Sequence, residues 1–188
     1  MDYAHFDAEE LLHLAIQAIG DQDHAAAIGR LKRSLELDPA VSQAHYLLGI
    51  EYALIGMAGR AIDTIGRALA LSPDMPLARF QLGMLLVTSG RMDEARSAWA
   101  PLDGLGDGHP LQLFKAGVLH LVSEEFDEAG RCIAAGIAAN TVNQALNRDM
   151  QRVLERLEQG AAPAPQAPVA ADAAPHLAVA AYHGNGSR

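Results

Sequence analysis

The sequence of 188 residues has little cysteine, little lysine and few aromatic side chains. Its single cysteine, Cys132, excludes a disulfide within the chain. Lys32 and Lys115 are its only lysines, and the formal net charge at pH 7 is −9. Affinity for duplex nucleic acid comes from Lys and Arg side chains that neutralise phosphates. We therefore expect a partner other than nucleic acid.

Long hydrophobic runs are also missing. No apolar stretch approaches the roughly 20 residues that a helix needs to cross a bilayer. The first ten residues, MDYAHFDAEE, have neither the basic start nor the apolar centre of a signal peptide. These patterns predict a cytoplasmic protein without membrane insertion. Arginine in place of lysine, together with much alanine, is typical of a GC-rich bacterial genome.

Patterns of residues that carry chemistry are absent as well. The eight histidines include no i, i+4 pair and no Cys–His cluster, so we expect no metal site. The glycine-rich stretch DGLGDGH at 103–109 lacks the lysine of a phosphate-binding loop. No serine has a histidine and an acidic residue in a recognisable catalytic arrangement. The sequence therefore predicts a protein that has no cofactor and no catalytic residues, and that is not an enzyme.

What the sequence does contain is an internal period of 34 residues. Three columns recur at this spacing in four units, two of small residues and one of large apolar residues. The columns are Ala15, Gly49, Gly83 and Gly117; Ala27, Ala61, Ala95 and Ala129; and Leu31, Ile65, Trp99 and Ile133. Val, Ile and Thr do not alternate with polar residues, so each unit is predicted to be two helices joined by a turn. The small residues let the two helix axes approach closely, and Pro39 and Pro73 end the second helices of the first two units.

These columns resemble the tetratricopeptide repeat (TPR) family, whose unit is a helix–turn–helix of 34 residues. The second unit matches best, with family residues at Leu48, Gly49, Tyr52, Ala61, Ile65, Ala68 and Pro73. The third unit departs from the pattern after Trp99, because Pro101 cuts its second helix short. The resemblance implies an all-α fold, an α-solenoid of about four TPR-like repeats. These repeats are residues 8–41, 42–75, 76–109 and 110–143.

Three segments flank the repeats or follow them. Residues 1–7 are an N-terminal extension. Residues 144–158, QALNRDMQRVLERLE, carry an apolar stripe, so we expect a helix that caps the last repeat interface. Residues 159–188 are rich in Ala and Pro and are predicted to be disordered, with a short apolar island, HLAVAAY, at 176–182.

The resemblance also implies a binding site, because first helices line the concave face in this family. Two positions of each first helix, one turn apart, point into the family's groove, and all of them are apolar here. They are Leu12, Ile16, Tyr46, Ile50, Phe80, Met84, Phe114 and Val118. A contiguous apolar surface of this kind usually has a partner. The alternative is that these side chains pack on one another and stay buried.

The function predicted from these features is a non-catalytic protein–protein interaction module, an adaptor or a chaperone-like protein. Its ligand would be an apolar helical or extended segment of another protein, held in the groove. The Lys and Asn clamp with which some family members bind a C-terminal carboxylate is absent. The alternative function is a self-associating scaffold or a regulatory subunit of a larger complex. The groove would then serve homo-oligomerisation or be plugged by the chain's own C-terminal tail.

Overall fold

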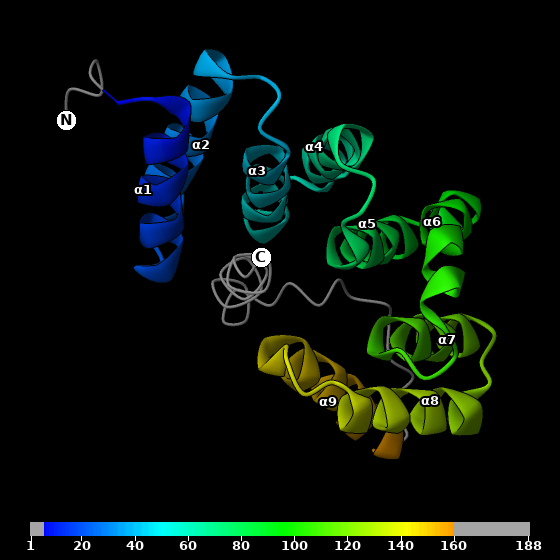
Figure 1. Ribbon diagram of the computed structural model, residues 1–188. Helices are drawn as coiled ribbons and strands as arrows, with labels where there is room; N and C mark the ends of the chain where they lie inside the picture. Colours follow the sequence, from blue (N-terminus) through cyan, green and yellow to red (C-terminus); the bar gives the residue numbers. More distant parts are fainter. Residues whose placement is uncertain (1–5, 160–188) are drawn as a thin grey trace. The chain divides into compact units, whose positions relative to one another are not determined.

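The computed structural model of the chain describes residues 6–159, and every regular element in that range is a helix (Figure 1). The predicted all-α class is therefore confirmed for this part of the chain. Residues 1–5 of the extension and residues 160–188 of the tail, with the apolar island, lie outside the described residues. The elements are α1 (Ala8–Gly20), α2 (His24–Leu37), α3 (Ser42–Leu54), α4 (Ala58–Leu71), α5 (Pro76–Thr88), α6 (Met92–Trp99), the 3-10 helix η1 (Ala100–Leu105), α7 (Pro110–Val122), α8 (Phe126–Ala139) and α9 (Gln144–Glu158).

The described residues form two compact units, 6–78 and 79–159, and the division falls inside α5. In the first unit α1 packs on α2, α2 on α3, and α3 on α4. In the second unit η1 contacts α6 and α7, α7 packs on α8, and α8 on α9 (Figure 1). The odd-numbered helices begin 34 residues apart, as the period predicts. Their first residues are Ala8, Ser42, Pro76, Pro110 and Gln144.

The turn inside each helix pair has one backbone conformation. One residue in each turn has a positive φ of 60–77°, and these residues are also spaced by 34. They are Gln22, Gly56, Gly90 and Glu124. The residue that follows each of them donates its N–H to the carbonyl oxygen of the residue five positions before it, at 2.8–2.9 Å. This hydrogen bond satisfies a carbonyl at the end of the first helix. Glycine suits this conformation in the two middle turns, whereas Gln22 and Glu124 adopt it despite having a Cβ.

The glycines of the small-residue column lie where the two helices of a pair touch. A Cβ at Gly49 would be 2.5 Å from Ile65 Cγ1, and a Cβ at Gly117 would be 2.6 Å from Ile133 Cγ1. At Gly83 a Cβ would overlap the indole of Trp99. These contacts confirm the close approach that the columns predict.

The third helix pair is irregular where the sequence places Pro101. Helix α6 has eight residues, whereas α2, α4 and α8 each have 14. Proline lacks the N–H that would continue the helix, and the chain proceeds as η1 instead. Asp103 in η1 accepts hydrogen bonds from Lys115 Nζ and, at 2.8 Å, from Gln112 Nε2 on α7. The Lys115 contact is the main reason that the pKa of Asp103 is lowered.

Helix α9 spans the residues predicted for the final helix and packs on α8. The Asn143 side chain accepts a hydrogen bond from Leu146 N–H at 3.0 Å and so caps the helix start. The apolar stripe is buried in the first half, at Leu146 and Met150, and half-buried beyond it. Asp149 is a charged residue within this buried part, and its side chain is 1% exposed. Its Oδ1 pairs with Arg152 at 3.2 Å, whereas its Oδ2 lacks a hydrogen-bond partner in the described chain.

We expect Asp149→Asn to stabilise the protein above pH 7. Burial raises the pKa of Asp149 from 3.8 to about 6, and Arg152 and Arg148 lower it only in part. A carboxyl with a raised pKa contributes stability below its unfolded pKa, and that stability is lost as the pH rises through the folded value. The free energy of unfolding therefore falls by about 3 kcal/mol between a pH below the unfolded pKa and a pH above the folded pKa, for a shift of this size. Urea unfolding at pH 4.5 and pH 8 measures about 2 kcal/mol of this loss, because the unfolded carboxyl is already largely ionised at pH 4.5, and the variant's advantage should grow by that amount. An exposed control on the same helix, Glu155→Gln, should change stability by less than about 0.5 kcal/mol at both pH values. A variant less stable than wild type at pH 8 would show that pairing with arginine outweighs burial.

Candidate functional site

The eight side chains predicted to line a groove are largely buried in the structure. Ile16 is half-buried, and the other seven are between 0% and 6% exposed. The seven are Leu12, Tyr46, Ile50, Phe80, Met84, Phe114 and Val118. A groove open to solvent would leave such side chains exposed, whereas both the packing alternative and a groove that another segment covers would bury them. A contact between these residues and a partner stays a prediction.

The aromatic members of this set have packing partners within the second unit. The Phe80 ring lies 6.0 Å from the Trp99 ring and 6.3 Å from the Phe114 ring, measured between centroids. Trp99 Nε1 also donates to the Phe80 carbonyl oxygen at 2.9 Å. The Phe114 ring occupies the space beside Gly136 on α8, where a Cβ would be 2.6 Å from two ring atoms. Phe80 and Phe114 therefore hold helices together within this unit.

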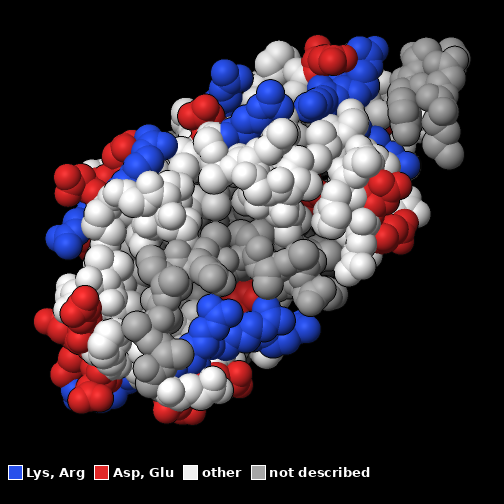
Figure 2. All heavy atoms as spheres, turned by 180° about the vertical axis from the view of Figure 1, so that it is seen from behind, with Lys and Arg blue, Asp and Glu red and all other residues white. Residues whose placement is uncertain are grey.

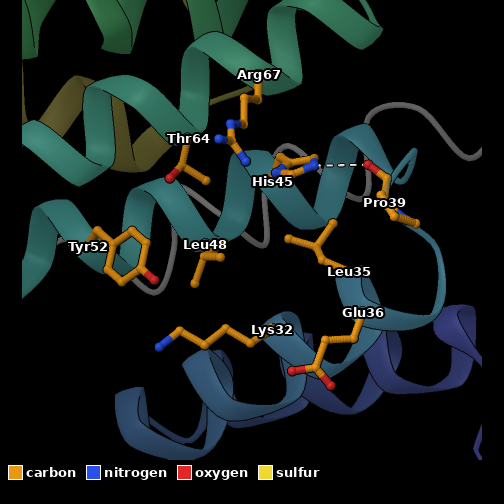
Figure 3. Close-up of a pocket in the computed structure, with 9 residues that line it drawn as sticks. All are labelled: Lys32, Leu35, Glu36, Pro39, His45, Leu48, Tyr52, Thr64 and Arg67. Carbon is orange, nitrogen blue, oxygen red and sulfur yellow. Dashed lines mark hydrogen bonds between the residues drawn. The ribbon is translucent and has the colours of Figure 1, made fainter.

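An open pocket in the first unit is formed by side chains of α2, α3 and α4 (Figure 3). Its volume is about 380 Å³, within the usual range for ligand sites. Three residues of α2, three of α3 and two of α4 line it, together with one loop residue. The lining residues are Lys32, Leu35, Glu36, Pro39, His45, Leu48, Tyr52, Thr64 and Arg67.

The pocket has an apolar floor and polar sides. Figure 3 shows Leu35 and Leu48 at its centre, with Lys32 on the α2 side and Arg67 on the α4 side. His45 Nε2 donates to the Pro39 carbonyl oxygen at 3.0 Å, because a carbonyl only accepts. This hydrogen bond holds the imidazole at the edge of the pocket.

Three cationic groups of α2 and α4, two of them in the pocket lining, lack acidic partners within the described part of the chain. Lys32 Nζ and Arg60 Cζ lie 5.9 and 5.8 Å from the centroid of the Tyr52 ring, within cation–π range. Among the described residues, no carboxylate oxygen lies within 4.0 Å of Lys32, Arg60 or Arg67. The one carboxylate of the lining, Glu36, instead pairs with Arg33 at 2.8 Å. On the face drawn in Figure 2, Lys and Arg side chains lie beside Asp and Glu at several places and also form one larger group.

A histidine–carboxylate pair links α2 to α3, with the imidazole 30% exposed and the carboxylate buried. His24 Nδ1 donates to Glu51 Oε2 at 2.8 Å, and the Glu51 side chain has no exposed surface. Burial raises the pKa of Glu51, and the hydrogen bond from His24 offsets part of that increase. Such a pair can serve acid–base chemistry only where a substrate reaches it. Because Glu51 is inaccessible, we assign the pair to the packing of these two helices.

Sequence reasoning missed the pocket. Lys32, Tyr52 and Arg67 come from three helices, and only Tyr52 stands at a position of the repeat pattern. The available signal was the scarcity of lysine, since one of only two lysines lies on α2. That signal does not indicate which residues of α3 and α4 lie opposite Lys32.

No family model matches the chain, and no curated protein matches it significantly. The TPR resemblance consequently depends on the residue columns and on the recurring helices and turns. No helix in the described range is both long enough and apolar enough to span a bilayer. Within residues 6–159, no three His, Cys, Asp or Glu side chains gather into a group that could hold a metal ion.

Proposed function

We propose that this chain is a non-catalytic helical-repeat module of the TPR type, acting in the cytoplasm as an adaptor or chaperone-like protein that binds another protein. The observation that carries the proposal is the recurrence, every 34 residues, of the helix start, the turn and the small-residue contact. Units that repeat in this way stack on their neighbours into an α-solenoid, in which α9 would cap the last interface. Such scaffolds present extended surfaces to partners.

We place the contact with the partner at the pocket between α2 and α4. Seven of the eight apolar first-helix residues are buried, and at least Phe80 and Phe114 are used for packing. The pocket, by contrast, combines an apolar floor with polar groups, as ligand sites in proteins do. Self-association through the same surface is an outcome that the test below distinguishes.

The test selects peptides from a displayed random library against the full chain and measures their affinities for two matched variants. Thr64→Trp fills the pocket from its α4 side, and Ala70→Trp places the same side chain at an exposed position of the same helix. We expect Thr64→Trp to weaken binding about tenfold or more, as occlusion of a binding hot spot does. Ala70→Trp should leave the affinity within about twofold.

Two results would contradict the proposal. Selected peptides that bind Thr64→Trp as tightly as wild type would exclude the pocket as the site. A chain that enriches no peptide, but forms a dimer that Thr64→Trp abolishes, would show that the pocket serves self-association instead.

A further inference from the structure

We propose that the pocket between α2 and α4 recognises an acidic segment of the partner protein. One apolar side chain of the segment enters above Leu35 and Leu48, while flanking carboxylates pair with Lys32 and Arg67. This inference rests on the proposed function and specifies the chemistry of its ligand.

The charge around the pocket supports an acidic ligand. The whole chain has a formal net charge of −9, yet the two cations of the lining, Lys32 and Arg67, have no carboxylate within 4.0 Å among the described residues. Glu36 is compensated by Arg33, so the charge left facing the pocket is positive. Interfaces favour partners whose charges complement such a patch, and repulsion between like charges disfavours basic segments.

The arrangement of the cations supports a carboxylate on each side of an apolar anchor. Lys32 projects from α2 and Arg67 from α4, with the leucines of the floor between them (Figure 3). The planar guanidinium of Arg67 can hold one carboxylate through two hydrogen bonds, and the ammonium of Lys32 can hold another as a point charge. The volume of about 380 Å³ is large enough for one bulky apolar side chain with part of its backbone. A free anion would leave the apolar floor uncovered.

The experiment compares two fluorescein-labelled peptides of about a dozen residues each. In the acidic probe, a single leucine lies between two pairs of glutamates in a Gly/Ser background; in the matched probe the glutamates are glutamines. We expect the acidic probe to bind the full chain at least about tenfold more tightly in fluorescence anisotropy. The difference should shrink when NaCl is raised from 50 to 500 mM, because salt screens exposed charges. Amide NMR shifts should change at Leu48 and Thr64.

A charge-reversed variant separates the pocket from the rest of the surface. Lys32→Glu with Arg67→Glu should lose the acidic probe and gain a probe with lysines in place of the glutamates. The control, Arg96→Glu with Arg156→Glu, makes the same change in net charge in the second unit and should bind the acidic probe like wild type. All four positions are exposed, so circular dichroism melts should stay close to wild type.

Several outcomes would overturn the inference. Equal binding of the acidic and glutamine probes would show that the carboxylates are not recognised. Complete displacement of the acidic probe by millimolar inorganic phosphate would show that the site binds a free anion. An unchanged affinity when the leucine of the acidic probe is replaced by serine would show that the apolar floor is not used. A dimer abolished by the Lys32→Glu and Arg67→Glu changes would identify a second copy as the occupant instead. If library-selected neutral peptides are still blocked by Thr64→Trp, the inference fails while the proposed function stands. If Thr64→Trp blocks nothing, both fail.

Discussion

Replacing Gly83 with alanine should destabilise the protein by about 3 kcal/mol, although alanine is the better helix former. The new methyl group would overlap the indole of Trp99, which has no exposed surface. The indole is also fixed by the hydrogen bond from Nε1 to the Phe80 carbonyl oxygen. Relief of the overlap therefore requires α5 and α6 to separate.

The same substitution at Gly29 should have the opposite sign. Gly29 is exposed on α2, and a Cβ there would meet no atom within 4 Å. Gly29→Ala should therefore stabilise the protein by about 0.5–1 kcal/mol, through the reduced entropy of the unfolded chain. Urea unfolding of the two variants at one temperature measures both effects. A stabilised Gly83→Ala protein would mean that this helix contact is loose.

Phe114→Asp should unfold the protein or leave it close to unfolding. The Phe114 ring has no exposed surface and fills the space beside Gly136. Removing a buried phenylalanine costs about 3–5 kcal/mol, and a carboxylate without a partner at that site adds to the loss. A typical domain has only about 5–15 kcal/mol of stability in total.

The matched control is Phe126→Asp, at the start of α8. The Phe126 side chain is 43% exposed, and a negative charge in the first turn of a helix is favourable, so stability should change by less than about 1 kcal/mol. Circular dichroism and thermal melts of the two variants make the comparison. If Phe114→Asp folds normally and only partner binding is lost, the groove interpretation is correct and the packing interpretation is wrong.

The local organisation of the chain could be read from the residues. The 34-residue period predicts where α1, α3, α5, α7 and α9 begin, because helix starts, turns and small-residue contacts depend on residues close in sequence. Pro101 predicts the early end of α6 for the same reason, since proline removes a backbone donor wherever it stands. Gly49, Gly83 and Gly117 likewise indicate close helix contacts, which the structure confirms.

The candidate sites could not be read in the same way. The apolar residues at Phe80 and Phe114 fit both an open groove and a packed core, because the sequence pattern shows which face of a helix is apolar but not what covers it. The pocket has no pattern in the sequence, since Lys32, Tyr52 and Arg67 lie on separate helices.

The helices, their turns and the small residues at which paired helices meet are predictable from the residues alone, since they follow from backbone chemistry and near neighbours. The burial of particular apolar side chains, and the lack of ion-pair partners for Lys32 and Arg67 among the described residues, are set by the folded arrangement of the helices. Both depend on contacts between residues far apart in the chain: Phe114 is buried because Gly136 leaves room for its ring, and the pocket exists because α2 and α4 present their side chains on either side of α3.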